Sequence, residues 1–411
     1  MKKTLLYILC CLLSLNTYAR TITVGKTAAV NCIQQALRMA NNGDTIRILA
    51  GIYREKGLVI RKPVVLIGQD YPVIDGENQY EVMAVKADSV TIAGFRVINS
   101  GVSSLNDYAG IKIYNSKKVT IRDNILSNNF FGIYTQLGSN CTILNNQITG
   151  CAKNEQQSGN GIHCWKSDSM LIEQNQVKGH RDGIYFEFVT HSLISNNKVA
   201  RNLRYGLHFM FSNNDSYLNN EFEQNGAGVA VMFSHHVTMT NNLFSQNWGD
   251  AAYGILLKEI SDSRIEKNRF KENTMALFLE GSNRITIQKN SFQRNGWAMK
   301  IQASCVDINV TNNNFLGNTF DVGTNGSLVL NTFQQNYWDK YEGYDLDRNN
   351  KGDIPYRPVS MYAVIVERNP TAMILFRSFM TTLFDKTEKL IPSLTPENLK
   401  DNAPLMKPLK L

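Results

Sequence analysis

The chain has 411 residues, a formal net charge of +8 at pH 7, 28 glycines and 9 prolines. Beyond residue 20 it has no basic run of the kind that binds nucleic acid, and no apolar stretch of the roughly 18 residues that a membrane-spanning helix needs. The five cysteines beyond residue 20 form no CxxC pair and no zinc-site spacing, and their odd number leaves at least one thiol outside any intrachain disulfide.

Residues 1–19 are predicted to be a secretory signal peptide. Lys2 and Lys3 precede a short apolar run at residues 4–15, and the small residue Ala19 marks the cleavage site. Removal of this segment lowers the formal net charge to +6. We therefore expect an exported protein without a membrane span.

Residues 20–70 are predicted to cap one end of the fold. Apolar residues recur at the spacing of one face of an amphipathic helix: Ile33, Ala36, Leu37 and Ala40. Short β-branched runs follow at residues 45–49, 58–60 and 64–67. A helix that leads into short strands suits the open end of a solenoid, because the first coil has no preceding neighbour with which to pair.

From about residue 80 to residue 335 the sequence repeats with a period of 22 or 23. Each unit carries a small residue followed by an aliphatic one, and in eight successive units an asparagine follows 14 positions later. This period predicts an all-β fold, a right-handed parallel β-helix with about 22 residues and three short strands per coil, over residues 20–335. The repeated asparagines are expected to adopt the left-handed corner conformation and to hydrogen-bond to one another along the stack. They are Asn124, Asn146, Asn175, Asn197, Asn220, Asn242, Asn268, Asn290, Asn313 and Asn331.

Alternation within the strands separates core positions from outward positions. The predicted core residues of three central units are Ile184, Phe186, Leu207, Phe209, Val229 and Val231. Two outward rows lie between them. The first is Tyr134, His163, Tyr185, His208, Ala230 and Leu256, and the second is Gln136, Trp165, Glu187, Met210, Met232, Lys258 and Glu280. A solvated strand face normally carries Thr, Ser, Lys or Glu, so we interpret this face as a candidate site. Two long corners, residues 151–160 and 247–253, border it, and insertions of this kind collect on binding faces.

The residue types on this face suit a soft metal, since thioethers bind Cu(I) and imidazoles bind copper in either state. Met210 lies two residues from His208 on one strand face, and Met232 lies one coil, about 5 Å, away. The candidate copper ligands are His163, His208, Met210, Met232, His235 and His236.

Two alternatives to a copper site remain open at this point. The face is covered by a C-terminal helix or a partner and binds no metal, or it carries the acid, base and cation of a polysaccharide lyase or uronate epimerase. The residues for that chemistry are Arg181, Asp182, Tyr185, Glu187 and His208. The face lacks the charged stripe that binds a polymer, which disfavours the enzyme.

Residues 336–411 are predicted to form a partly helical C-terminal extension with an extended tail. An amphipathic helix is expected over residues 370–390; it is too short to span a membrane and contains Arg377. A run of acidic and amide residues, Asp345, Asp347 and Asn349 with Asp353 beyond them, is similar to the start of a calcium loop. It lacks the glycine at the sixth position and the glutamate at the twelfth, so calcium and a solvated polar turn remain alternatives.

Six segments are more specific than the repeat itself. They read RDGIYFEF, RYGLHFMFS, GVAVMFS, YGILLKE, NYWDKYEGYDLDRNNKGDIPYRPV and LTPENLKDNAPLMKP. Together they closely resemble the NosD family of periplasmic maturation proteins of nitrous-oxide reductase, over nearly all of the chain beyond the signal peptide. The resemblance implies an accessory role in copper-centre assembly during denitrification, with transiently bound Cu(I), and no catalysis.

The resemblance also implies partners: the permease and ATPase of an ABC transporter, a copper-chaperone lipoprotein and nitrous-oxide reductase, with membrane association only through the transporter. We expect docking through the outward face and through the apolar side of the extension. The predicted docking residues are Trp165, Tyr185, Glu187, Lys258, Phe376, Phe379 and Phe384.

Overall fold

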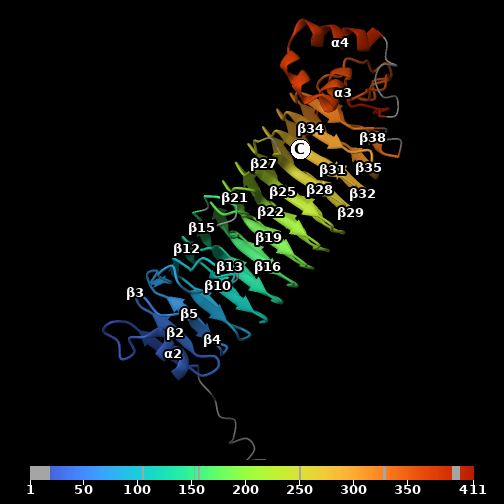
Figure 1. The fold of residues 1–411 in the computed structure, drawn as a ribbon. Helices are drawn as coiled ribbons and strands as arrows, with labels where there is room; N and C mark the ends of the chain where they lie inside the picture. Colours follow the sequence, from blue (N-terminus) through green and yellow to red (C-terminus); the bar gives the residue numbers. More distant parts are fainter. Residues whose placement is uncertain are drawn as a thin grey trace, which may run out of the picture.

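The computed structural model describes residues 19–103, 106–151, 153–155, 158–249, 251–326, 330–390 and 399–411. The predicted signal peptide lies outside them except for Ala19. The described chain winds into a rod of three parallel sheets, as predicted, with a helix at one end and further helices at the other (Figure 1). Each sheet gains one strand per coil, so residues one coil apart lie side by side.

Sheet A has 14 strands. They are β1 (Thr21–Val24), β2 (Thr45–Ile48), β5 (Val65–Gly68), β8 (Thr91–Ala93), β11 (Thr120–Arg122), β14 (Thr142–Leu144), β17 (Leu171–Glu173), β20 (Leu193–Ser195), β23 (Ser216–Leu218), β26 (Thr238–Thr240), β29 (Ser261–Glu266), β32 (Asn283–Gln288), β35 (Val306–Thr311) and β38 (Thr332–Gln334). Sheet B has 13 strands. They are β3 (Ile52–Tyr53), β6 (Val73–Asp75), β9 (Arg96–Ile98), β12 (Ile125–Ser127), β15 (Gln147–Thr149), β18 (Gln176–Lys178), β21 (Lys198–Ala200), β24 (Glu221–Glu223), β27 (Leu243–Ser245), β30 (Arg269–Lys271), β33 (Ser291–Gln293), β36 (Asn314–Leu316) and β39 (Tyr337–Trp338).

Sheet C has 12 strands and carries the outward rows. They are β4 (Leu58–Ile60), β7 (Met83–Val85), β10 (Ala109–Tyr114), β13 (Phe131–Gln136), β16 (Ile162–Trp165), β19 (Ile184–Glu187), β22 (Tyr205–Met210), β25 (Ala227–Met232), β28 (Tyr253–Lys258), β31 (Met275–Glu280), β34 (Trp297–Ile301) and β37 (Phe320–Gly323). The last strand of the rod is β39, so the β-helix runs three residues beyond the predicted boundary at 335.

Helix α2 (Ile33–Met39) closes the N-terminal end, as predicted. Its apolar face buries Ile33, Ala36 and Leu37 against β1, β2 and β4. The carboxylate of Glu55 accepts hydrogen bonds from the backbone N–H groups of Ile33 (2.7 Å) and Gln34 (2.8 Å). These are donors that the first turn of a helix leaves without an intrahelical partner, so Glu55 caps the helix from a distant position in the chain.

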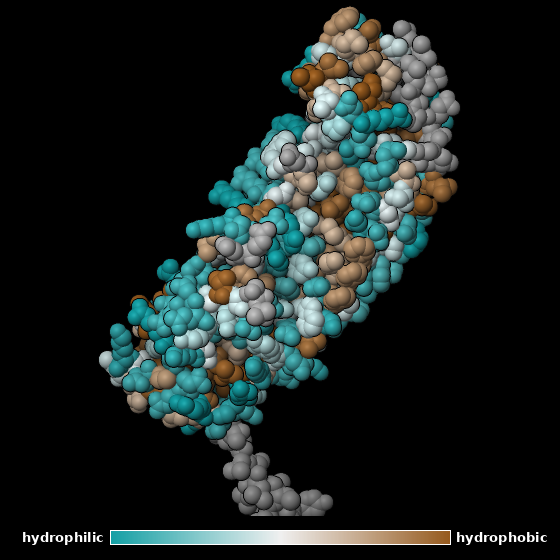
Figure 2. All heavy atoms as spheres, in the orientation of Figure 1, coloured by the Kyte–Doolittle hydropathy of each residue, from teal (hydrophilic) through white to brown (hydrophobic). Residues whose placement is uncertain are grey.

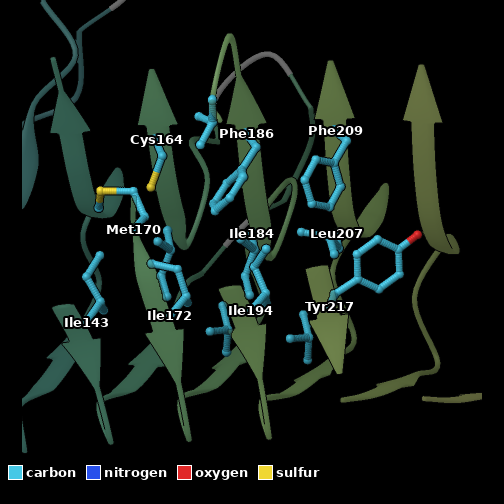
Figure 3. Packing of buried hydrophobic residues seen from close by; sticks show 14 of the residues in the cluster. Ile143, Cys164, Met170, Ile172, Ile184, Phe186, Ile194, Leu207, Phe209 and Tyr217 are labelled. Carbon is cyan, nitrogen blue, oxygen red and sulfur yellow. The ribbon is translucent and has the colours of Figure 1, made fainter. Parts of the chain in front are cut away.

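The interior of the rod is filled by the inward positions of the strands. Cys164, Ile184, Phe186, Leu207 and Phe209 are all fully buried and point toward the opposite sheets (Figure 3). The prediction of inward and outward positions is confirmed here, and Cys164 is a core residue whose thiol pKa is raised by burial. Aromatic rings stack one above another at roughly the coil spacing, as between Phe270 and Phe292, whose centroids are 4.8 Å apart.

Nine of the ten repeated asparagines, from Asn124 to Asn313, form a buried ladder as predicted. Asn331 is the wrong one: it is half-buried and accepts from the backbone N–H of Ile308, and Asn336 continues the ladder after Asn313. Asn220 illustrates the pattern: its backbone N–H and its side-chain Nδ2 both donate to Oδ1 of Asn242, at 2.9 and 3.0 Å. The predicted left-handed conformation is wrong for these residues and belongs to the residue before each one, such as Asn219 (φ 56°) and Asn241 (φ 57°). The preceding residue makes the bend, which directs the ladder side chain into the corner.

The C-terminal tail closes this ladder. Asn336, the ladder residue of the last coil, donates from its Nδ2 to Oδ2 of Asp401 at 3.1 Å. The tail then returns along the rod, where Leu409 exchanges two hydrogen bonds with the side chain of Asn314, at 2.8 and 2.9 Å. Residues 399–411 therefore lie over the corner of the last coils.

The helical part of the extension is divided into three pieces. They are α3 (Met361–Arg368), the 3₁₀ helix η1 (Pro370–Leu375) and α4 (Phe379–Leu390). The single helix predicted over 370–390 is broken before α4, where Arg377 has φ 61°. Helix α3 packs against β37 at the end of the rod opposite α2 (Figure 1). Among the described residues no helix has both the length and the apolar character to cross a membrane.

Candidate metal and partner site

The first outward row runs along the outer face of sheet C. Register pairing places Tyr134, His163, Tyr185 and His208 in successive coils. Their ring centroids follow at 4.5, 4.7 and 4.7 Å. The side chains point away from the core as predicted, but each is only 6–9% exposed. The rings cover one another, and Phe131, the first residue of β13, packs against Tyr134 and His163.

His163 is held as a neutral imidazole. Its Nδ1 is 3.1 Å from the amide Nδ2 of Asn160, and its Nε2 has no hydrogen-bond partner among the described residues. Burial lowers the pKa of His163 to about 3. Because an amide nitrogen only donates, Nδ1 accepts and the hydrogen of the neutral ring lies on Nε2. His163 therefore has no free lone pair for a metal in this arrangement.

His208 has a different environment. Neither of its ring nitrogens has a hydrogen-bond partner among the described residues, and its Nδ1 lies 3.8 Å from Oδ2 of Asp182. Asp182 is fully buried and accepts hydrogen bonds from Nε and Nη2 of Arg204, at 2.9 and 2.6 Å. Burial opposes ionisation of Asp182, but the Arg204 hydrogen bonds and the contact with His208 outweigh it and lower its pKa to about 2. A permanent carboxylate thus faces one edge of His208.

The second outward row lies at the ends of the same strands and is half-buried. Met210 and Met232 are register partners in β22 and β25. The hydroxyl of Tyr185 donates to Sδ of Met210 at 3.8 Å, within the range of a sulfur acceptor. The two thioethers therefore lie in adjacent coils beside His208.

The structure does not gather the six predicted copper ligands. His163 lies two coils from His208, about 10 Å along the rod, with Tyr185 between them. His235 and His236 are exposed in the turn that follows β25. Within the described part of the chain no three His, Cys, Asp or Glu side chains converge as metal ligands do. The adjacent subset is His208, Met210 and Met232, because only these share neighbouring outward positions.

The predicted docking residues on this face are engaged within the chain. Lys166 lies over the ring of Trp165 at 4.6 Å, and Lys258 pairs with Glu280 at 3.6 Å. Tyr185 is buried in the first row, whereas Glu187 is half-buried. The C-terminal helices lie at the far end of sheet C, so the alternative in which they cover this face is wrong.

An exposed aromatic strip was missed by the sequence reasoning. Phe188 and Phe211 are 43% and 38% exposed, and with Phe233 they stack at centroid distances of 5.2 and 5.1 Å. Each directly follows a second-row residue, which is the signal that identifies the strip. Figure 2 shows apolar side chains in a band along the face of sheet C. Because neighbouring ring faces contact each other, both faces of Phe211 are covered and cannot stack on a sugar.

The acidic run at residues 345–353 forms a compact hydrogen-bonded turn. Asp345 accepts from the backbone N–H groups of Asn349 (3.0 Å) and Asn350 (2.8 Å), and Asp353 accepts from that of Leu346 (2.7 Å). The side-chain amide of Asn349 donates to Asp347 at 2.7 Å. These contacts favour the polar-turn alternative, and calcium binding stays a prediction from the sequence.

The extension exposes apolar side chains at the end of the rod. Ile374 is 89% exposed, Phe379 78% and Phe376 41%. Phe384 instead packs against the cluster that joins the helices to the rod, which contains Trp297, Phe320, Tyr362, Ala363 and Val366. Of the three phenylalanines predicted to dock a partner, Phe376 and Phe379 are therefore the accessible ones.

These features define a right-handed parallel β-helix protein, and residues 72–177 match the model of the right handed beta helix region. Residues 144–343 match the family described as periplasmic copper-binding protein (NosD). This match and the two relatives described next support membership of the NosD family. A probable ABC transporter binding protein NosD from Pseudomonas aeruginosa is 27% identical over 394 residues, covering 90% of each chain. The protein of the same name from Stutzerimonas stutzeri is 26% identical and spans 88% of this chain and 86% of its own.

Solved structures share the fold alone. PfbA, a surface adhesin of Streptococcus pneumoniae, superposes with a TM-score of 0.58 at 13% identity, over 71% of this chain and 86% of its own. The A-module of the mannuronan C-5 epimerase AlgE6 of Azotobacter vinelandii superposes with a TM-score of 0.52 at 14% identity, over 75% and 89%. An adhesin and an epimerase on one scaffold show that the fold does not select a function, so function must be argued from the site.

Proposed function

We propose that this protein is a periplasmic accessory protein that binds Cu(I) transiently on the outer face of sheet C while its C-terminal extension holds it on an ABC transporter. The observation that carries the proposal is the placement of His208, Met210 and Met232 at adjacent outward positions, where nothing in the fold requires these residue types. The copper-binding description of the NosD family and the transporter-binding name of the relatives support it.

The donor set fits Cu(I) as cargo. The unpartnered ring nitrogens of His208 are buried polar atoms that the fold leaves without a hydrogen bond, and such atoms mark a ligand or functional site. Two thioethers beside one imidazole form a soft set that favours Cu(I) over hard cations. Met210 and Met232 are half-buried, so they remain open to an incoming donor protein. Exchange with a copper-chaperone lipoprotein or with nitrous-oxide reductase then begins at the two thioethers, because both ring nitrogens of His208 are buried.

A Cu(I) titration of the full chain without its signal peptide tests the metal site. Under anaerobic conditions with a competing chromophoric chelator, we expect about one tight site. The double variant Met210→Ala, Met232→Ala should weaken it by at least 100-fold, because both thioether donors are lost. Met275→Ala is the matched control: Met275 lies in β31 of the same sheet, packed against the cluster under the C-terminal helices. Equal affinities of wild type and double variant would contradict the ligand assignment.

The same preparations address the lyase or epimerase alternative. Asp182, Arg204 and His208 supply acid, base and cation types, but Asp182 and His208 are buried, Arg204 is half-buried, and the strip beside them is apolar. We expect no turnover of alginate or pectin. Release of unsaturated uronate, or a change in the uronate composition of alginate, would favour the enzyme.

Attachment to the transporter is proposed to use the exposed apolar side chains of η1 and α4. Burial of large apolar side chains is the main driving force for association, and charged replacements oppose it. Phe379→Asp is expected to abolish co-purification with the permease and ATPase. Leu346→Asp is the control, since Leu346 is also 78% exposed but lies in the acidic turn. Retention of the complex by the Phe379 variant would rule out this surface.

A further inference from the structure

The charge that faces His208 is held unusually firmly. Both carboxylate oxygens of Asp182 are bound by the guanidinium of Arg204, and Oδ1 also accepts from the backbone N–H of Tyr205 at 3.3 Å. Arg181 adds a further contact at 3.8 Å. A two-point interaction between a planar guanidinium and a carboxylate fixes direction as well as distance. Asp182 therefore has little freedom to turn away from His208.

The imidazole of His208 is fixed from the other sides. The ring of Tyr185 lies 4.7 Å from it, centroid to centroid, and the ring of Tyr205 lies 4.9 Å from it. Only 6% of the residue is exposed. Nδ1 is the nitrogen 3.8 Å from Asp182, so Nε2 is on the opposite edge of the ring. A hydrogen on Nδ1 is attracted by the carboxylate, whereas a lone pair there is repelled.

We infer that Asp182, oriented by Arg204, is a positioning residue that keeps the hydrogen of His208 on Nδ1, so that Nε2 presents its lone pair to Cu(I). This inference rests on the proposed function. In metal sites, a carboxylate on the second ring nitrogen sets the tautomer and orientation of the ligating histidine, and its loss typically lowers metal affinity about 10- to 100-fold.

The same row contains an internal contrast. Asn160 contacts His163 through an amide nitrogen, which donates and so requires the hydrogen of that ring on Nε2. The two histidines lie on the same sheet face, two coils apart, but have opposite tautomers. The amide of Asn160 places the hydrogen of His163 on Nε2, and the carboxylate of Asp182 places that of His208 on Nδ1. This difference assigns the metal to His208 and leaves His163 as a packing residue of the row.

The test is the tautomer of each histidine in the metal-free protein, read by long-range ¹H–¹⁵N correlation spectra of ¹⁵N-histidine-labelled full chain. Wild type should show His208 with its hydrogen on Nδ1 and His163 with its hydrogen on Nε2. Asp182→Asn should move the hydrogen of His208 to Nε2. The amide oxygen is expected at the Oδ1 position, where Arg204 Nε and the Tyr205 N–H donate, and the amide nitrogen at the Oδ2 position that faces the ring, with loss of the Arg204 Nη2 bond. Cu(I) affinity should fall about 10- to 100-fold with it. Asn160→Asp is the matched control, which should shift the hydrogen of His163 alone and leave Cu(I) affinity unchanged.

Three results would overturn the inference. One is a wild-type His208 whose hydrogen is on Nε2, a measurement that needs no variant to fold. Another is an Asp182→Asn protein that binds Cu(I) as tightly as wild type while the Met210→Ala, Met232→Ala protein does not; the proposed copper site then stands without a role for Asp182. The last is absence of Cu(I) binding by wild type, which overturns the proposed function and the inference with it.

Discussion

Replacing Asp401 by alanine is expected to release the C-terminal tail from the last coil. The carboxylate is fully buried and accepts five hydrogen bonds. The donors are Gln335 N (3.0 Å), Asn336 N (2.9 Å), Asn336 Nδ2 (3.1 Å), Trp338 Nε1 (3.1 Å) and Ala403 N (3.1 Å). Four of these five donors belong to the last coil, and the substitution removes their acceptor.

The magnitude follows from those four donors. A buried donor left without a partner costs about 1–3 kcal/mol, and water will reach part of this end once the tail lifts away. We therefore expect tail docking to weaken by about 3–5 kcal/mol, which raises the open population roughly a hundredfold to a few thousandfold, at about 1.4 kcal/mol per factor of ten. The loss is local, because each coil of a solenoid contacts only its neighbours.

Hydrogen exchange read by mass spectrometry is the suitable assay, since global melting averages over the whole rod. Peptides that cover β38, β39 and residues 399–411 should lose protection in Asp401→Ala, while those of β10–β22 remain unchanged. Asp339→Ala is the control: this carboxylate lies on the same coil, is exposed, and accepts one backbone hydrogen bond, from Gly317. Unchanged protection of β38 and β39 in the Asp401 variant would refute the reasoning.

Three further predictions concern the rod. In Gly183→Ala the new Cβ would lie 2.2 Å from Val199 Cγ1 and 2.6 Å from the Gly206 carbonyl oxygen. We expect this overpacking to lower the free energy of unfolding by about 1–3 kcal/mol. An unchanged melting temperature would contradict this expectation. In Asn220→Ala the amide ladder is interrupted at a buried position, and unfolding by urea should show a loss of about 2–4 kcal/mol; a loss below about 1 kcal/mol would argue against a structural ladder. Burial raises the pKa of Asp215 to about 8, against about 4 in the unfolded chain. As pH rises, the unfolded chain therefore releases this proton before the folded chain does, and wild type loses stability between about pH 4 and pH 8. Asp215→Asn lacks this titration, so its free energy of unfolding relative to wild type should rise by a few kcal/mol across that interval. A difference in urea midpoint that does not change with pH would contradict this.

Periodicity made most of the fold predictable. The step between small residues and asparagines predicted the coil length, and alternation placed Phe186 inside and His208 outside because a strand has a period of two. The end of the rod and the division of the last helices were harder to predict from the sequence. They depend on Asp401 and Arg377, whose roles appear only when distant segments meet.

The candidate site was predictable in residue type but not in environment. Nothing local in the sequence distinguishes His163 from His208, since both occupy the same outward position. Their difference comes from Asn160 and Asp182, which a corner insertion and a corner turn bring against them. The burial of the first outward row could not be predicted from the sequence either, because it arises when rings of successive coils cover one another.

The asparagine ladder has a direction. One N–H of each ladder amide donates to the next coil toward the C-terminal end, while the other donates to a backbone carbonyl of the preceding coil, as Asn336 does to Val310. The last amide at Asn336 therefore offers one hydrogen to whatever follows it. A further coil, or the end of another molecule that supplies an acceptor, would extend the series. Asp401 accepts that hydrogen but, as a carboxylate, has none to pass on. The rod is thereby terminated chemically, which removes a template for end-to-end filament growth that an open solenoid would present.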